Sequence, residues 1–526
     1  MKRREFLVAS AAATAVPSLV RANTSRVLRF IPSVDLTVLD PHWTAASITR
    51  NHTYLVFDTL FGMDGSYRMS PQMAEGYQVD DDGKRWTLTL REGLKFHDGE
   101  PVLARDCVAS IRRWAQRHAF GQALMAATDG LAATDDRTIS FRLKKPFPLL
   151  PDALGTVVPP VAAIMPERMA KTDAFTQVKE VIGSGPYRFK ADERLAGARV
   201  VYERFADYRP RERGTPDWTA GPKIVHFDRV QWTVIPEAST AAAALQTGEQ
   251  DWWEAVNLDL LPRLRRERNI KTIGLDPSGS IAFMCMNHQQ APFDNPGIRR
   301  ALMGAVNQED FMQAAAGTDL SMWRTGVGFF CPTSPMANTA GLEALTSPRD
   351  VKRVREQIAA AGYKGERVVL IAPGDLGHLK RWADVGADMM VKVGLNIDYQ
   401  LTDWGTMQQR RQKMDPVDQG GWSCYFSGID GTTALSPAVN FLLRGNGIKG
   451  YLGWPTSAKI EELRDAWFDA PDLAAQQRIA AELQLQAFQD VPYIPLGQYY
   501  PHTAYRTDLT DVLNGFAVFW NVRRKG

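Results

Sequence analysis

The sequence predicts an α/β protein with two main lobes and a smaller accessory one, in which an open or mixed sheet occurs in at least two places. Three observations support this prediction. The 526 residues exceed one ordinary domain. A composition of 44% hydrophobic and 23% charged residues is typical of a folded chain. Segments with alternating hydrophobic residues are interspersed with segments of helical period along the whole length, and no internal repeat is visible.

Residues 1–22 are predicted to be an export signal of the twin-arginine type. Arg3 and Arg4 precede a weakly apolar run that ends at Val20, and Ala22 suits a signal peptidase that cuts before Asn23. The run is too short and too polar for a good membrane span, and no cysteine near the cut offers a site for a lipid anchor. We therefore expect a soluble periplasmic protein; the alternative is that this segment is the first helix of the fold.

The first half of the mature chain alternates between strands and helices. Trp86, Leu88 and Leu90 alternate with polar residues, which indicates a half-buried antiparallel hairpin. Val108 and Ile111 are spaced as on one face of a helix. The predicted strands are 26–32, 86–90, 138–143, 187–189, 199–202 and 225–235, and the predicted helices are 49–59 and 104–117.

The second half is richer in helices. An alanine-rich helix follows Ser239 and Thr240 and ends at Gly248, which suits a cap at one end and a left-handed glycine at the other. Asn295 and Pro296 begin another helix, with proline at its first position. Strands at 368–371 and 395–400 flank a helix at 380–393 as in a βαβ unit, and two helices at 457–468 and 472–489 precede an apolar segment at 491–496.

Charge and cysteine content exclude two classes of function. The formal charge of +3 comes from the predicted signal, where four basic residues and one acidic residue give 4 − 1 = +3, so the mature chain is neutral and nucleic acid is not an expected partner. The cysteines are far apart and form no Cys-x-x-Cys pair, so we expect buried thiols and no zinc site. They are Cys107, Cys285, Cys331 and Cys424.

The sequence contains no convincing catalytic motif. It lacks the Gly-x-Ser-x-Gly, His-Glu-x-x-His and phosphate-loop patterns. Residues 445–450 match Gly-x-Gly-x-x-Gly, but they lead into 451–455 and not into a helix that could hold a pyrophosphate, so we interpret them as a surface loop. His42 and His52 could bind a metal or a chelate, although ordinary hydrogen bonding is the favoured interpretation. We expect no catalytic residue, no bound metal and no cofactor.

The chain strongly resembles the extracellular solute-binding proteins of peptide/nickel-type ABC importers, known as family 5. The resemblance recurs in order along nearly the whole mature chain. The segments that carry it are 39–41, 71–74, Trp86, 90–101, 104–108, 183–187, 245–251, 295–302 and 491–495.

This resemblance implies a two-lobed periplasmic binding protein fold with an added third domain and a ligand enclosed between lobes I and III. Lobe I corresponds to 23–55, 183–275 and 495–526, accessory domain II to 56–182, and lobe III to 276–494. The chain would cross between lobes I and III near 274–279 and 493–498. Such a protein closes around its ligand by hinge bending, as a monomer, and delivers it to a permease in the cytoplasmic membrane.

The resemblance is weakest in one loop of lobe III. Peptide-binding relatives carry there an aspartate that holds the α-amino group of the ligand, in a pattern similar to Trp-x-x-Asp-x-x-Asp-Pro-Asp. This chain has instead the sequence 422–431, in which only Asp430 is a candidate for that role; the alternative is a turn residue before Gly431. A ligand carboxylate would favour an arginine, and the sequence does not rank Arg324, Arg410 and Arg444.

Aromatic residues in Gly/Pro-rich loops are further candidates for ligand contact, packing being the alternative for each. The favoured ligand is a small peptide or a peptide-like solute. A metal chelate, an opine-like compound and an oligosaccharide stay open, as does an exported hydrolase. The predicted ligand-binding residues are His42, Trp43, Trp404, Trp422, Tyr425, Ser427, Asp430, Gln498 and Tyr499.

Overall fold

The computed structural model describes residues 26–525, so the predicted signal at 1–22 lies outside the described residues. The chain divides into two compact units. Unit 1 comprises residues up to 275 together with the segment from 502 onward, and unit 2 comprises 276–501. The chain therefore passes between the units twice, at 275/276 and at 501/502. The assignment of three lobes, with the second crossing near 493–498, stays a prediction.

Unit 1 is built around a seven-stranded mixed sheet with the strand order β10-β11-β12-β1-β13-β21-β14. β1 is parallel to β12 and to β13, whereas the other pairs are antiparallel. The C-terminal β21 lies between β13 and β14, so the returning chain completes this sheet. The strands are β1 (Val27–Ile31), β10 (Tyr187–Phe189), β11 (Arg199–Arg204), β12 (Arg229–Thr233), β13 (Trp252–Trp253), β14 (Ile270–Gly274) and β21 (His502–Arg506).

The core of unit 1 is aromatic. Phe30 of β1 is fully buried, and three rings surround it. Its ring centroid lies 5.7 Å from Trp232, 5.4 Å from Trp252 and 4.9 Å from Phe519. The contacts with Trp252 and Phe519 are edge-to-face, a geometry that stabilises a core beyond the burial of area. Several tryptophans are therefore packing residues.

The remaining strands of unit 1 include a four-stranded antiparallel sheet of the order β5-β6-β8-β7. In β6 the residues Trp86, Leu88 and Leu90 are buried, which confirms the predicted alternation. The strands are β2 (Asp58–Thr59), β3 (Phe61–Met63), β4 (Met69–Pro71), β5 (Ala74–Asp80), β6 (Arg85–Leu90), β7 (Thr128–Ala133), β8 (Thr138–Leu143), β9 (Ala163–Ile164), β22 (Leu509–Thr510) and β23 (Arg523–Arg524).

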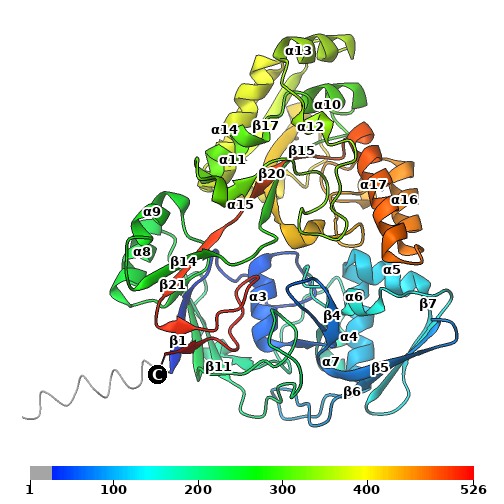
Figure 1. Ribbon diagram of the computed structural model, residues 1–526, viewed down its shortest axis with the longest axis vertical. Helices are drawn as coiled ribbons and strands as arrows, with labels where there is room; N and C mark the ends of the chain where they lie inside the picture. Colours follow the sequence, from blue (N-terminus) through cyan, green and yellow to red (C-terminus); the bar gives the residue numbers. More distant parts are fainter. Residues whose placement is uncertain (1–25, 526) are drawn as a thin grey trace, which may run out of the picture. The chain divides into compact units, whose positions relative to one another are not determined.

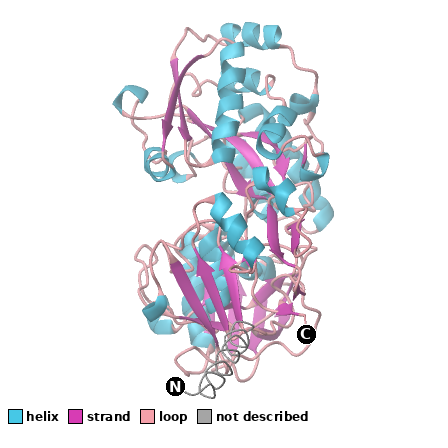
Figure 2. Ribbon diagram, turned by 90° about the vertical axis from the view of Figure 1, so that its left-hand side faces the viewer, coloured by secondary structure: helices cyan, strands magenta, loops and turns pink. Residues whose placement is uncertain are grey.

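The helices of unit 1 pack beside these sheets (Figure 2). The helix predicted at 49–59 spans Ser47–Val56, because Asp58 and Thr59 pair with β9 as a short strand. Gly248 has φ 79°, the left-handed conformation predicted after the alanine-rich helix. The helices are α3 (Ser47–Val56), α4 (Ala104–Arg117), α5 (Ala119–Ala127), α6 (Leu150–Gly155), α7 (Glu167–Ala170), α8 (Ala238–Thr247) and α9 (Leu261–Leu264), with 3₁₀ turns η1 (Ala191–Glu193) and η2 (Leu258–Leu260).

Unit 2 contains a six-stranded mixed sheet with the order β16-β20-β15-β19-β17-β18. β17 and β18 are parallel and are joined by helix α14, which confirms the predicted βαβ unit. The apolar segment at 491–496 leads into β20, which pairs with β15. The strands are β15 (Ser280–Met286), β16 (Trp323–Arg324), β17 (Arg367–Pro373), β18 (Asn396–Thr402), β19 (Cys424–Asp430) and β20 (Ile494–Tyr499).

Helices cover this sheet, and α11 and α14 lie against its β19–β20 region (Figure 1). Proline occupies the first position of α10, as predicted. The helices are α10 (Pro296–Met303), α11 (Gln308–Ala316), α12 (Glu343–Thr346), α13 (Val351–Ala360), α14 (Gly377–Lys392), α15 (Trp404–Arg410), α16 (Ala458–Phe468) and α17 (Leu473–Asp490), with 3₁₀ turns η3 (Leu320–Met322), η4 (Val417–Gln419), η5 (Gly431–Ala434) and η6 (Gly447–Lys449).

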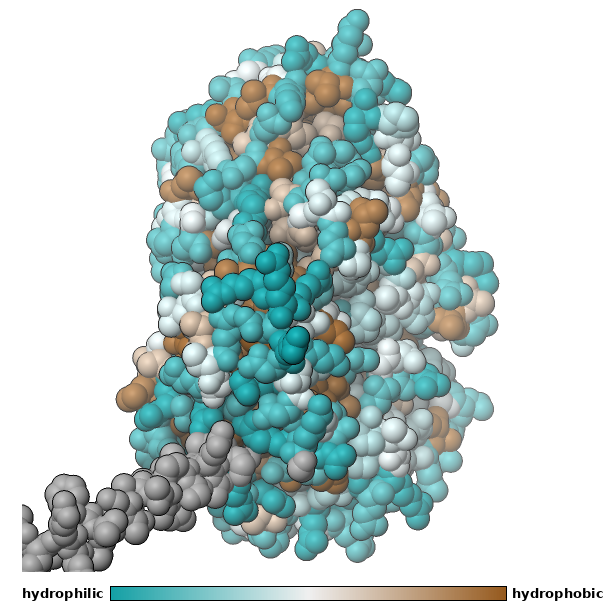
Figure 3. Space-filling view, turned by 60° about the vertical axis from the view of Figure 1, so that its left-hand side comes forward, coloured by the Kyte–Doolittle hydropathy of each residue, from teal (hydrophilic) through white to brown (hydrophobic). Residues whose placement is uncertain are grey.

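The four cysteines are buried and unpaired, as the sequence predicts. The face of the molecule in Figure 3 is mainly hydrophilic, with hydrophobic residues in scattered groups. In the part of the chain from 26 to 525, no helix is long and apolar enough to cross a membrane.

Candidate ligand-binding site

The nine predicted ligand-binding residues lie in three different surroundings. His42 and Trp43 belong to unit 1, and the other seven belong to unit 2. Within unit 2 they are divided between the two faces of the six-stranded sheet, because side chains of a strand point alternately to opposite faces.

His42 and Trp43 have structural contacts within unit 1. The His42 ring is fully buried, and its Nε2 lies 3.0 Å from the carbonyl oxygen of Ala163. Burial and the nearby charge of Arg113 lower the pKa of His42 to about 4, so the ring is neutral at pH 7. The Trp43 ring packs under Arg117, whose Cζ lies 4.7 Å from the ring centroid. Both residues therefore have contacts within unit 1, and ligand contact stays a prediction for them.

Asp430 and Tyr499 meet at one end of the unit 2 sheet. Ser280, the first residue of β15, pairs with Asp430 on one side and with Tyr499 on the other. The Tyr499 ring lies 5.6 Å from that of Trp382 on α14. Burial raises the pKa of Tyr499 to about 12, and the neighbouring Asp430 adds to this rise while Ser280 opposes it. These side chains therefore form a polar and aromatic group on the α14 face.

Tyr425, Ser427 and Gln498 lie on the opposite face of the sheet. Tyr425 pairs with Cys285, Ser427 with Phe283, and Gln498 with Ile281. The amide of Gln498 is buried and donates a 2.5 Å hydrogen bond to the carbonyl of Ser278, so it holds the backbone of unit 2.

Trp422 packs against Tyr425. It is fully buried, its Nε1 donates to the carbonyl of Lys413 at 3.2 Å, and its ring lies 5.2 Å from that of Tyr425 and 5.8 Å from that of Trp454. Tyr425 stands three residues after Trp422, the position at which the loop of peptide-binding relatives has its first aspartate.

Helix α15 places Trp404 near Tyr425, and the guanidinium of Arg411 contacts both rings. Asp403 caps the helix by accepting a hydrogen bond from the N–H of Thr406 at 2.9 Å. Arg411 follows Trp404 by seven residues, two turns later on the same face. Its Cζ lies 5.4 Å from the ring centroid of Trp404 and 5.5 Å from that of Tyr425. We call the set Trp404, Gln408, Arg411, Tyr425 and Tyr451 the α15 cluster.

The α15 cluster contains two polar atoms that lack partners. Nε of Arg411 and Oε1 of Gln408 are shielded from solvent and have no hydrogen-bond partner among residues 26–525, whereas the Tyr425 hydroxyl interacts with Cys285 and Tyr451. Gln408 lies between Trp404 and Arg411 on the same helix face. Buried polar atoms normally have partners, because each one left without a partner costs free energy. These atoms make the α15 cluster a candidate site for a bound molecule or for water.

Tyr425 is a neutral hydrogen-bond donor. Burial raises its pKa well above the usual value, the Cys285 thiol and Tyr451 add to the rise, and the charge of Arg411 opposes it. Tyr451 lies partly exposed and packs against Phe441 with tilted rings, whose centroids are 4.6 Å apart. The cluster thus combines aromatic walls with one cation and one phenolic donor.

The structure distinguishes the three arginines that the sequence analysis could not rank as partners of a ligand carboxylate. Arg410 donates to the carbonyls of Gly420 and Gly421 and to Gln400, and Arg444 forms a bidentate pair with Glu461, so both hold the fold. Arg324 is exposed on β16. Sequence reasoning missed Arg411, although its spacing of seven residues from Trp404 could have indicated a shared helix face.

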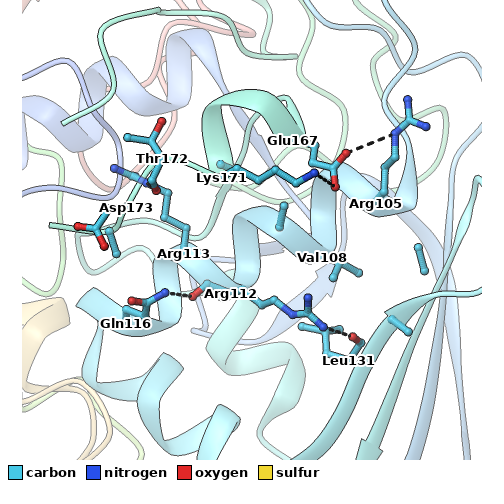
Figure 4. Close-up of a pocket in the computed structure, with 15 residues that line it drawn as sticks. Arg105, Val108, Arg112, Arg113, Gln116, Leu131, Glu167, Lys171, Thr172 and Asp173 are labelled. Atoms are coloured by element: carbon cyan, nitrogen blue, oxygen red, sulfur yellow. Dashed lines mark hydrogen bonds and ion pairs between the residues drawn. The ribbon is translucent and has the colours of Figure 1, made fainter. Parts of the chain in front are cut away.

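A groove of about 660 Å³ lies elsewhere, between α4, α7 and β7 of unit 1 (Figure 4). None of the nine predicted residues lines it. Several of its charged groups have partners within the fold. Glu167 pairs with Lys171 at 3.1 Å and with Arg105 at 3.9 Å, and Arg112 donates a hydrogen bond to the backbone carbonyl of Leu131 at 2.7 Å.

Comparison with known proteins identifies the class of the protein. Residues 68–448 match the model of the bacterial extracellular solute-binding proteins, family 5. The chain belongs to this family. Its members are solute-binding proteins rather than enzymes.

Two relatives and two solved structures illustrate the similarity. A probable peptide ABC transporter periplasmic-binding protein of Sinorhizobium fredii is 36% identical, with 98% of each chain covered. The glutathione-binding protein of Escherichia coli K12 is 25% identical and covers 94% of this chain and 93% of its own.

The solved structures share the fold. An ABC transporter-associated periplasmic binding protein (DppA) of Helicobacter pylori in complex with the peptide STSA has a TM-score of 0.77 at 20% identity, and covers 96% of this chain and 100% of its own. A periplasmic binding protein (AgaA) of Agrobacterium tumefaciens R10 in complex with agropinic acid has a TM-score of 0.78 at 20% identity, and covers 95% and 99%. These likenesses confirm the predicted periplasmic binding protein fold.

Proposed function

We propose that this protein is the periplasmic substrate-binding component of an ABC importer, which captures a small peptide or peptide-like solute and delivers it to a membrane permease. The observation that carries the proposal is the full-length match, at 36% identity, to a relative described as a peptide ABC transporter binding protein. The α15 cluster supports it, because aromatic walls with a few polar groups can hold peptides of varied sequence.

Capture by hinge closure is part of the proposal. The chain joins its two units only at 275/276 and 501/502 among the described residues. The first connection links β14 to β15 and the second links β20 to β21. A few residues at the ends of such strands can absorb the change of backbone angles that a hinge requires.

Asp430 and Tyr499 are the better candidates for ligand contact, because they meet on one face of the unit 2 sheet. We assign the ligand ammonium to Asp430, beside Ser280 and Tyr499, since a carboxylate in a dry site pairs strongly with an ammonium. Tyr425 and Ser427 lie on the opposite face of the sheet from Asp430, and for these two and for Trp404 ligand contact stays a prediction. For the residues with structural partners, ligand contact stays a prediction; these are His42, Trp43, Trp422 and Gln498.

The cellular setting follows from the same role. Export by the twin-arginine signal at 1–22 would place the mature protein in the periplasm, without a lipid anchor. It would act there as a monomer, without a cofactor and without catalysis. The second candidate ligand is an opine-like acid, one of the alternatives that the sequence analysis did not exclude.

A panel of di- to pentapeptides tests the proposal on the mature protein. A ligand present at a hundredfold excess over Kd should stabilise the folded protein by about 2.7 kcal/mol, which a thermal shift detects. Saturation with the tightest peptide should also reduce the radius of gyration in small-angle scattering. If no peptide binds, the ligand is a different kind of solute, and an unchanged radius argues against hinge closure.

Asp430→Asn tests the assigned ammonium site in the same panel. Affinity for a free-amine peptide should fall by on the order of a hundredfold, because the ammonium loses its charged partner. N-acetylation of the peptide should weaken binding to the wild type by a comparable factor. Asp418→Asn is the control, since Asp418 is an exposed carboxylate of unit 2 that pairs with Arg367. Equal calorimetric affinities of wild type and Asp430→Asn would remove Asp430 from the site.

A further inference from the structure

The groove between α4, α7 and β7 of unit 1 lies along a free strand edge. β7 is the last strand in the order β5-β6-β8-β7, so among residues 26–525 it pairs with β8 alone. In an antiparallel pair, residues that direct their N–H and C=O groups to the partner alternate with residues that direct them away. Thr134 donates to the carbonyl of Thr138 in β8 at 3.0 Å, so Leu131 and Ala133 direct theirs away from the sheet. Both residues line the groove.

Arg112 of α4 covers part of this edge. Its Nη2 donates to the carbonyl of Leu131 at 2.7 Å (Figure 4). Proteins cover or charge strand edges in this way, because an open edge pairs with other chains. The Arg112 side chain occupies the place that an N–H of an added strand would take. A strand can displace it, since its partner is a neutral carbonyl and not a carboxylate.

The groove has room for a backbone beside β7. Its volume of about 660 Å³ lies in the range of pockets that enclose a ligand. Helix α4 packs against both β7 and α7 and forms the floor between them. Five short side chains in the lining let another chain approach closely; they are Ala109, Ala132, Ala133, Ala170 and Ala174. An extended segment would meet the edge of β7 with matching N–H and C=O groups.

The charged residues of the lining favour a negatively charged segment. The lining contains four cations and two carboxylates, which are Arg105, Arg112, Arg113, Lys171, Glu167 and Asp173. Arg113 is neutralised by Asp40. Glu167 pairs with Lys171 at 3.1 Å, whereas Arg105 lies 3.9 Å from the same carboxylate, beyond hydrogen-bonding distance. Arg105 and Arg112 therefore have donors available for a further carboxylate.

We propose that this groove is a docking site for an extended, acidic segment of a partner protein, which adds to β7 as a fifth strand of the sheet. An N–H of the segment replaces the Arg112 side chain at the carbonyl of Leu131, and the released guanidinium pairs with a carboxylate of the segment. The inference goes beyond the proposed function, because none of the predicted ligand-binding residues lines the groove.

Calorimetry with the blocked peptide Ac-Val-Glu-Val-Asp-Val-Glu-Val-NH2 tests the inference on the mature protein. Both ends are blocked so that neither acts as the free end of an imported peptide. At low salt this probe should bind about five- to tenfold more tightly than the analogue with Gln and Asn in place of Glu and Asp, because exposed ion pairs contribute modestly. The difference should shrink at high salt.

Methylation of alternate backbone nitrogens of the probe tests strand addition directly. Only every second residue of an added strand directs its N–H to the edge. Methylation of one alternate set should therefore abolish binding, and methylation of the other set should leave it nearly unchanged. A probe that is held by its side chains alone would respond equally to both.

Variants then locate the probe. In Arg112→Met the acidic and neutral probes should bind alike, because the cation that distinguishes them is lost. Ala133→Pro, which removes an N–H that points away from β8, should weaken both probes by about tenfold. Arg85→Met is the matched control and should keep the full preference, since Arg85 is an exposed arginine of β6 outside the groove. Circular dichroism checks that each variant is folded.

The outcomes separate this inference from the proposed function. An excess of the tightest free peptide of the di- to pentapeptide panel should not displace the probe. If no peptide of that panel binds and the blocked probe still does, the proposed function is wrong and the docking site stands. The inference is overturned if the probe does not bind, if both methylated sets bind equally, or if the acidic preference survives in Arg112→Met. A dimer of the free protein that the probe dissociates would also overturn it, because the occupant would then be a second copy of the chain.

Discussion

Asp40 and Arg113 form an ion pair that fixes the N-terminal loop of unit 1. Their side chains are 0% and 2% exposed, and two N–H groups of Arg113 donate to the carboxylate at 3.0 and 2.7 Å. The backbone N–H groups of His42 and Val178 donate to the same carboxylate. Burial alone would raise the pKa of Asp40, but Arg113 and these N–H groups lower it below the usual value.

Arg113→Met should destabilise the protein strongly. It leaves Asp40 buried without a cation, and removal of one partner of a buried pair costs about 3–5 kcal/mol. Urea titration followed by circular dichroism measures the loss. Arg142→Met, which breaks the exposed pair with Asp129, should cost less than about 1 kcal/mol. A loss of similar size in both variants would contradict the structural role of the Asp40–Arg113 pair.

The close packing of α14 on the unit 2 sheet depends on a glycine. Gly386 lies against the ring of Phe426 on β19, and a Cβ at this position would lie 1.9 Å from Cζ of that ring. The Phe426 ring is itself stacked on Phe311 of α11, with centroids 5.8 Å apart, so it has little room to move. This contact positions the strand that carries Tyr425 and Asp430.

Gly386→Ala should therefore destabilise unit 2 and weaken ligand binding. Overpacking of this kind typically costs about 1–3 kcal/mol, which exceeds the gain in helix propensity of about 1 kcal/mol. Gly377→Ala at the start of the same helix is the control, since its Cβ would meet nothing closer than 3.7 Å, at Arg381. Thermal unfolding of both variants measures the difference. A stabilised Gly386→Ala protein would show that the contact is looser than described.

At the scale of the whole molecule, buried neutral histidines make stability depend on pH. Six of the eight histidines have a pKa lowered to about 3 or about 4, chiefly by burial. In the unfolded chain each takes up a proton near pH 6.5, whereas in the folded chain it does not. The unfolded state thus binds more protons below pH 6.5, and stability falls as the pH falls.

The melting temperature should therefore decrease between pH 7.5 and pH 5.5. Each such histidine contributes up to ~1.4 kcal/mol per pH unit between pH 6.5 and its lowered pKa. Asp152 acts in the opposite sense, because burial raises its pKa to about 6, and burial also raises the pKa of Asp106 and Glu254, but these are three groups against six. Thermal scans at several pH values and constant ionic strength measure the slope. A melting temperature that rises on acidification would contradict the burial of these histidines.

Much of the fold could be predicted because local patterns carry it. The strand at 138–143 and the helix at 104–117 match the structure at both ends, since alternation and helical spacing are properties of neighbouring residues. The helix predicted at 49–59 ended too late, because Asp58 and Thr59 are drawn into pairing with residues 163–164, far away in the sequence. Long-range pairing of that kind leaves no local signal.

The sequence by itself determined the family, the βαβ unit and the buried cysteines, because these depend on motifs and on periodicity. Only the tertiary structure showed which of the predicted ligand-binding residues lie close together. It put Asp430 and Tyr425 on opposite faces of one sheet, placed His42 and Trp43 in structural contacts, and brought Arg411 to Tyr425. The physical reason is that a side chain's partners are set by strand register and helix packing across the fold, which one position in a sequence does not record.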